Sequence, residues 1–199
     1  MALGTLAVTG DPDADRLVNS DGTALLIGML LDQQVPMEWA FKGPATLKER
    51  LGHLDAVTIA AMDPEDLVAV CVSKPAVHRF PASMGRRIHD LCTVLAAQYG
   101  GDGANVWKDV RTGEELYERL RALPGYGEEK SKIFVAILAK RLDERPEGWE
   151  QAAGPFAEST PRSVADIDGP DALARVRDWK RAQKAKGKKK TDPSGAGGS

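Results

Sequence analysis

Apolar residues recur at helical spacing along most of the chain, and no segment alternates for long enough to predict a strand. The segment 24–31 is apolar all round, which predicts a central buried helix. The segment 83–99 predicts an amphipathic helix, because Ile88, Leu91 and Leu95 fall on one of its faces. The predicted fold class is therefore all-α.

Proline and glycine positions predict where several helices begin and end. Asp63 followed by Pro64 is typical of an N-cap and a first helical residue, so a helix should begin there. Pro36 should end or kink the central helix. We expect Gly43-Pro44 to separate that helix from a short one over 45–51.

A tight glycine turn joins two predicted helices within 114–142. The turn is Leu123-Pro124-Gly125-Tyr126-Gly127. Its glycines allow a sharp reversal, and the N–H groups that follow converge at the positive end of the second helix. Such a site can bind one phosphate, with Lys130 and Lys132 adding charge beside it. A bare αα-hairpin without a ligand is the alternative.

The C-terminal part combines irregular and strongly basic segments. A helix is predicted over 146–153 and a last one over 170–179, with loop between them. Net charge is −2, but 180–199 hold seven Lys and Arg and one Asp, or +6, so 1–179 carry −8. We expect one helical domain over 1–179 and a disordered basic tail over 180–199 that adds salt-dependent affinity for nucleic acid.

Cysteine and histidine content limits the cofactor chemistry. Cys71 and Cys92 are the two cysteines, which excludes a disulfide framework, a four-thiolate zinc site and an iron–sulfur cluster. The three histidines are not spaced as metal ligands, so no metal and no cofactor are expected. The apolar run 24–31 is too short to span a bilayer. We expect a monomeric protein of the reduced cytoplasm that has no membrane role.

Two motifs in the right order resemble the helix-hairpin-helix DNA glycosylase superfamily. The turn at 123–127 is similar to the superfamily's L-P-G-V/I-G hairpin, and 25–34 resembles its early core helix, which ends in glutamine. In detail the chain looks most like an actinobacterial-type base-excision-repair branch without an iron–sulfur cluster. The resemblance covers roughly 15–155. It implies a two-lobed α-helical fold that binds double-stranded DNA across a cleft, in association with the nucleoid, and flips a nucleotide into a pocket.

The resemblance also assigns roles to individual residues. Gln34, with Gln33 beside it, would fill or probe the gap left by the flipped nucleotide, although both glutamines could merely cap the core helix. The family's catalytic aspartate lies some 20 residues past the hairpin, and ungapped counting places Glu147 there, at an expected helix start. Asp143 and Asp166 are the alternatives. Glu147 could equally be an ordinary first-turn residue.

The lysine that forms a Schiff base in the strand-cleaving members of the superfamily has no counterpart here. Its position is occupied by Glu129, and Lys130 lies one residue on, about 100° around the helix. The resemblance therefore predicts a monofunctional DNA N-glycosylase, a base-excision enzyme that releases a damaged or mismatched base by hydrolysis. The alternative is a non-catalytic DNA-binding member that has lost the catalytic aspartate. A helical protein-interaction module is disfavoured by the glycine turn and the basic tail together.

Overall fold

The computed structural model describes residues 4–187 and residue 191, and in this part of the chain every regular element is helical. In chain order the α-helices are α1 (Pro12–Ser20), α2 (Gly22–Leu31), α3 (Met37–Leu51), α4 (Ala56–Ala61), α5 (Pro64–Val72), α6 (Pro81–Gln98), α7 (Gly113–Arg121), α8 (Glu128–Arg141), α9 (Trp149–Ala153) and α10 (Pro170–Ala185). The 3-10 helices are η1 (Gly103–Val106), η2 (Gly154–Ala157) and η3 (Val164–Asp166). The predicted all-α class is confirmed.

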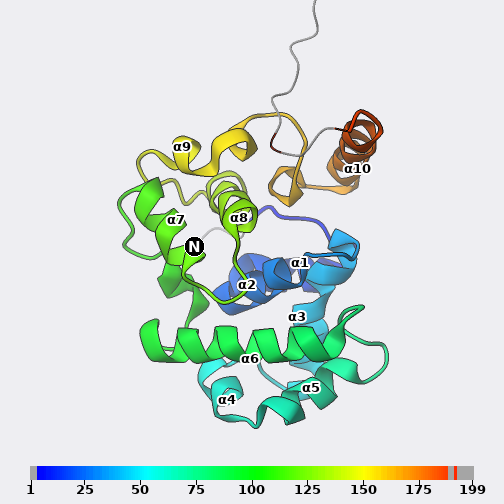
Figure 1. Cartoon of the computed structure of the whole chain (residues 1–199), viewed down its shortest axis with the longest axis vertical. Helices are drawn as coiled ribbons and strands as arrows, with labels where there is room; N and C mark the ends of the chain where they lie inside the picture. Colours follow the sequence, from blue (N-terminus) through cyan, green and yellow to red (C-terminus); the bar gives the residue numbers. More distant parts are fainter. Residues whose placement is uncertain (1–3, 188–190, 192–199) are drawn as a thin grey trace, which may run out of the picture.

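Helix α2 lies at the centre of the molecule, as its uninterrupted apolar sequence predicts. Every residue from Thr23 to Leu31 is buried, and the Asp21 carboxylate caps the helix by accepting the N–H of Ala24 at 3.0 Å. Figure 1 shows α2 between an upper group, α7 to α10, and a lower group, α4 to α6. Helix α2 contacts α6 below, and Tyr126 and Lys130 of the α7–α8 unit bond to it from above, so its two ends are natural positions for a site.

Helix α3 corrects the prediction of a break at Gly43-Pro44. The helix runs without interruption from Met37 to Leu51, and both residues of the pair are buried within it. A Cβ on Gly43 would lie 2.3 Å from Cδ1 of Leu31, so the glycine allows α2 and α3 to pack closely. The pair therefore marks a packing site, where burial offsets the hydrogen bond that Pro44 cannot donate.

Helix α10 corrects the predicted boundary of the C-terminal tail. The expected last helix ended at 179, but α10 continues to Ala185. Ala172 and Val176 are buried against the body and hold the N-terminal half of α10 in place. Of the predicted disordered tail, 180–185 are therefore helical, whereas 188–190 and 192–199 lie outside the described residues.

The segment before α9 corrects the prediction of a helix beginning at Pro146. Glu147 is extended and pairs with the start of α7: its N–H donates to the carbonyl of Arg111 at 3.0 Å, and its carbonyl accepts the N–H of Gly113 at 2.7 Å. Gly148 then adopts φ 73°, and the helix begins at Trp149. Glu147 is thus positioned by an isolated β-bridge to Thr112 and not by a helix N-terminus.

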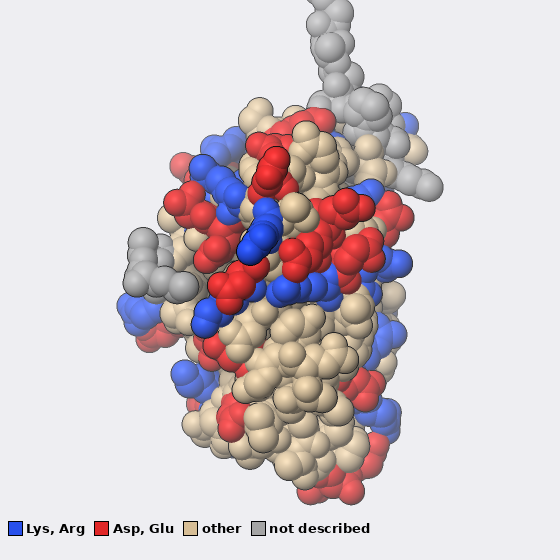
Figure 2. Space-filling view, turned by 90° about the vertical axis from the view of Figure 1, so that its left-hand side faces the viewer, with Lys and Arg blue, Asp and Glu red and all other residues tan. Residues whose placement is uncertain are grey.

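Charge is mixed on the visible surface. On the side shown in Figure 2, Lys and Arg side chains lie among Asp and Glu side chains over the upper part, and the lower part is largely uncharged. No helix in the described part of the chain is long and apolar enough to cross a membrane.

Candidate nucleic-acid interface

The turn between α7 and α8 is packed directly onto the C-terminal half of α2. Gly125 adopts φ +80°, and a Cβ there would lie 2.3 Å from Cδ1 of Leu30. The buried Tyr126 hydroxyl donates to the carbonyl of Leu26 at 2.8 Å, and burial raises the pKa of Tyr126 well above its ordinary value. The two helices and their turn are therefore fixed against the central helix.

The outer side of the same turn is open. Gly127 is the N-cap of α8, it is exposed, and a Cβ on it would meet nothing within 4 Å. Main-chain N–H groups at this position can bind a phosphate oxygen. The first turn of α8 also carries Glu128 and Glu129, which oppose an anion. Lys132 pairs with Glu128 at 2.6 Å and lowers the pKa of that carboxyl. The positive charge of Lys132 is therefore largely compensated within the protein.

The Lys130 side chain, which comes from α8, is directed to the C-terminal end of α2 and not to the open side of the turn. Its ammonium group donates to the carbonyls of Met29, Leu30 and Asp32, the last two at 3.3 Å, at the C-terminal end of α2. A cation there compensates the negative end of the helix and satisfies carbonyls that no helical N–H can reach. Lys130 thus joins α8 to the loop that follows α2. Spacing alone could not reveal this contact across 98 to 101 positions.

The two glutamines after α2 differ sharply in environment. The Gln33 side chain is held: its Nε2 donates to the carbonyl of Leu30 at 2.9 Å, and its Oε1 accepts from Arg87 at 3.3 Å. Gln34 is exposed and adopts φ +57°, a left-handed conformation that is uncommon for residues other than glycine. Strained positions of this kind cluster at binding and active sites. The structure therefore displays one glutamine and immobilises the other.

His78 fixes the glutamine loop against the loop that precedes α6. It is 1% exposed, its Nδ1 accepts the N–H of Phe80 at 3.0 Å, and its Nε2 donates to the carbonyl of Gln33 at 2.9 Å. Burial lowers the pKa of His78, which keeps the ring neutral, as this pair of hydrogen bonds requires. The sequence could not reveal this role, because a lone His carries no signal of such a bridge.

Exposed aromatic side chains flank His78. Trp39 is 39% exposed and Phe80 is 43% exposed, and their ring centroids lie 6.4 and 6.1 Å from the imidazole. The Arg79 guanidinium lies 5.4 Å from the Phe80 ring centroid. Exposed aromatic rings beside a cation are well suited to stacking on nucleic-acid bases.

The three carboxylates considered for catalysis occupy different environments. Asp166 is a structural residue: it pairs with Lys140 at 2.7 Å and accepts the main-chain N–H groups of Arg162 and Ser163, each at 3.0 Å. Asp143 is exposed and pairs with Arg145 at 3.2 Å. Both side chains are thus engaged by partners within the protein.

Glu147 is exposed and lines a hollow of about 670 Å³ among α7, α8 and α9 that Lys132 and Tyr117 also line. Its carboxylate forms no hydrogen bond or ion pair with a described residue. Glu147 lies beside the first residue of α7, and the glycine turn follows the last residue of the same helix. The length of α7, roughly 13 Å at 1.5 Å per residue, therefore separates Glu147 from the turn.

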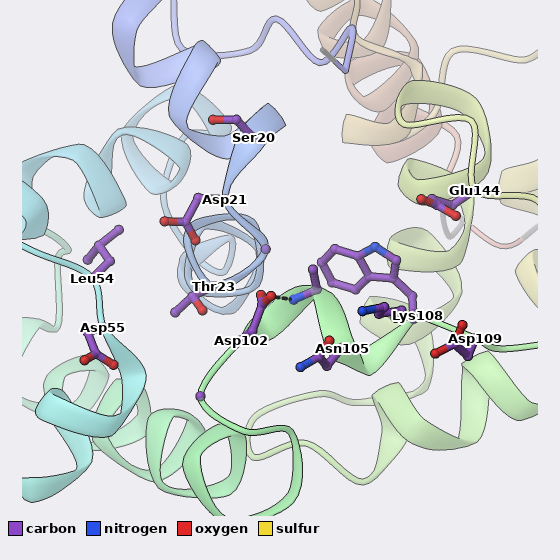
Figure 3. Close-up of a pocket in the computed structure, with 14 residues that line it drawn as sticks. Ser20, Asp21, Thr23, Leu54, Asp55, Asp102, Asn105, Lys108, Asp109 and Glu144 are labelled. Carbon is purple, nitrogen blue, oxygen red and sulfur yellow. Dashed lines mark hydrogen bonds between the residues drawn. The ribbon is translucent and has the colours of Figure 1, made fainter. Parts of the chain in front are cut away.

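Another hollow, of about 640 Å³, lies at the opposite, N-terminal end of α2 (Figure 3). The charged residues of its lining are mostly acidic, with Lys108 as the one basic side chain among the described lining residues. The acidic residues are Asp21, Asp55, Asp102, Asp109 and Glu144. This electrostatic character is unsuited to a phosphate backbone. The candidate interface is therefore the C-terminal end of α2.

A family model describing the HhH-GPD superfamily base excision DNA repair protein matches residues 27–192. This match spans most of the chain, from within α2 through the glycine turn to α10, and the chain belongs to that superfamily. A search of curated proteins and a search of solved structures each found no match. Membership confirms the predicted family and identifies a base excision DNA repair protein of a family that acts on DNA.

Proposed function

We propose that the protein is a monofunctional DNA N-glycosylase that opens double-stranded DNA, extrudes a damaged or mismatched nucleotide and hydrolyses its N-glycosidic bond. The observation that carries this proposal is the display of Gln34, in a left-handed conformation, at the end of α2 that also holds the glycine turn. A base inside a stacked duplex is inaccessible to hydrolysis, so such an enzyme must first open the helix.

Gln34 is the residue that we assign to the opened duplex. Its exposed amide can donate to and accept from a base that has lost its partner. Gln33 and His78 would act indirectly, since their hydrogen bonds hold the loop in which Gln34 stands. Phe80 and Trp39 offer apolar surface for the neighbouring bases. Within the turn Leu123 to Gly127, Gly125 and Gly127 would hold a phosphate through their main-chain N–H groups. Pro124 has no N–H, and those of Leu123 and Tyr126 donate to the carbonyls of Leu120 and Leu123.

Glu147 is the carboxylate that we assign to base release. A negative charge beside the sugar would stabilise the oxocarbenium-like transition state, and the same group can accept a proton from the attacking water. Of the three candidates, Glu147 is the one whose carboxylate is open to a ligand, because Asp166 and Asp143 have partners. The assignment requires the extruded nucleotide to reach along α7 to the hollow beside Lys132.

We expect no strand cleavage, and the position of Lys130 supports this expectation. A Schiff base needs an amine with a free electron pair, whereas this ammonium group donates to the carbonyls of α2. Glu129, one residue earlier, offers no amine. The product should therefore be an intact strand with an abasic site.

The test is base release from duplexes that carry uracil, hypoxanthine, alkylated purines, oxidised bases or mismatches, with abasic sites revealed by alkali. Release from any of these substrates, lost in Glu147→Gln while binding persists, supports the proposal. Cleavage without alkali would overturn the monofunctional assignment. Duplex binding without release from any substrate would identify the chain as a non-catalytic DNA-binding member.

A further inference from the structure

Helix α10 is anchored beside the glutamine loop by contacts that the proposed reaction does not use. The buried Arg162 guanidinium packs on the Trp179 ring, with its Cζ 5.3 Å from the ring centroid. Arg177 forms an ion pair with Glu38, and Lys180 lies 3.3 Å from Sδ of Met37. Met37 and Glu38 begin α3, three and four residues after Gln34. Three residues span at most about 11 Å, so the middle of α10 lies close to the displayed glutamine.

The side of α10 next to its buried face carries a basic stripe. Its members are spaced i, i+3, i+4 and i+7, which places them on one helical face. They are Arg177, Lys180, Arg181 and Lys184. The stripe is about 10 Å long at 1.5 Å per residue. Its first half lies against α3, whereas Arg181 and Lys184 are exposed beyond the body. Arg181 also forms an exposed ion pair with Asp178, which a phosphate would have to displace.

The rest of the chain makes this stripe important for binding a polyanion. Residues 1–179 carry −8, and the first turn of α8 adds Glu128 and Glu129 beside the proposed phosphate site. The face shown in Figure 2 presents cations and carboxylates together. Affinity for DNA at physiological salt depends largely on cations that displace counterions from phosphates. An acidic body therefore needs a segregated basic element next to the site where the duplex is opened.

We propose that the basic stripe of α10 binds the phosphate backbone of the duplex flanking the nucleotide opened at Gln34. The location rests on the proposed function, whereas the phosphate contact is measured by binding alone. Arg181 and Lys184 would contact phosphates directly. Arg177 and Lys180, held against Glu38 and Met37, would fix the angle at which α10 leaves the body. The contact is independent of base sequence.

The test compares Arg181→Gln/Lys184→Gln with a control of equal charge change, Lys48→Gln/Lys108→Gln, in the full chain. Lys48 and Lys108 are exposed and line hollows away from the C-terminal end of α2. The binding constant for an undamaged 20-base-pair duplex is measured from 50 to 200 mM salt. Each lost phosphate contact should reduce the slope of log K against log salt by about 0.9. We expect a reduction of about 1 to 2 in the α10 variant and a smaller change in the control.

Equal slopes in wild type and the α10 variant would overturn the proposal, and so would equal reductions in both variants. A wild-type chain that binds no duplex at 50 mM salt would overturn it as well. Base release is measured separately at saturating substrate. A reduced slope without base release from any substrate would leave the α10 contact established and the proposed glycosylase activity contradicted, so the two failures are distinguishable.

Discussion

The hydroxyl of Tyr126 donates a hydrogen bond to the main-chain carbonyl of Leu26, 2.8 Å away and 100 residues earlier in the chain. Lys130 strengthens the same junction one helical turn later by donating to the carbonyls at the end of α2. The glycine turn and the glutamine loop are therefore joined through one helix. Phosphate binding at the turn and base contact at Gln34 would occur on a single rigid unit.

Alanine substitution should change the free energy of unfolding differently at the two glycines of the turn. Gly125→Ala places a Cβ against Leu30 at φ +80° and should lower the free energy of unfolding by about 2–4 kcal/mol. Gly127→Ala meets no atom within 4 Å and should leave stability within about 0.5 kcal/mol. If a phosphate binds there, Gly127→Ala should still weaken duplex binding. Urea unfolding and a binding titration check both, and unaltered binding would contradict a phosphate at this turn.

Substitutions at the two glutamines should have different effects: at Gln33 on stability, and at Gln34 on DNA binding. Gln33→Ala removes hydrogen bonds to Leu30 and Arg87 and should cost about 1 kcal/mol of stability. Gln34→Gly relieves the left-handed conformation and should leave stability within about 0.5 kcal/mol. Its affinity for a duplex with an abasic-site analogue should fall about 10-fold, or about 1.4 kcal/mol, with intact duplex bound as before. Equal losses on both duplexes would argue against a base-reading role.

His78 should make stability depend on pH. Burial lowers its folded-state pKa below the unfolded value of 6.5, so the unfolded state binds the proton first. The contribution of neutral His78 is complete above pH 6.5 and is lost as the pH falls from there to the lower folded-state pKa. Urea unfolding at pH 5 to 8 should show this slope in wild type and in the matched control His53→Gln. The slope should be reduced in His78→Gln, and an unchanged slope there would contradict the assignment.

Asp166 should be important for stability and dispensable for chemistry. Asp166→Asn leaves Lys140, whose side chain is only 13% exposed, without its ionic partner, which should destabilise the protein by about 3 kcal/mol. Base release per folded molecule should be unchanged at a temperature where the variant is folded. Thermal unfolding together with single-turnover kinetics checks both. Loss of base release in a folded variant would favour Asp166 over Glu147 as the catalytic carboxylate.

Local patterns were sufficient to predict much of this fold. The apolar segment 24–31 predicted a buried central helix, and the spacing of Ile88, Leu91 and Leu95 predicted the buried face of α6, which begins two residues earlier than expected. Helix period and cap residues are properties of adjacent residues, so a single sequence contains them. The predicted glycine turn is present for the same reason.

Features that depend on distant contacts could not be predicted. Gly43-Pro44 indicated a break because local propensity disfavours a helix there, but packing against Leu31 overrides it. The position of Lys130 depends on α2, some 100 positions earlier, and the engagement of Asp166 depends on Lys140. For Glu147, counting gave the position but could not reveal the pairing with Arg111 and Gly113.

The most direct test of the account is base release by wild type and Glu147→Gln on the same set of damaged duplexes, with binding measured in parallel. We predict that wild type releases at least one kind of base and leaves an alkali-labile, uncleaved strand. Glu147→Gln should bind the same duplex and release its base at least about 100-fold more slowly. Unchanged release in Glu147→Gln would contradict the assignment of this carboxylate. Tight binding by wild type with no release from any substrate would contradict the glycosylase itself.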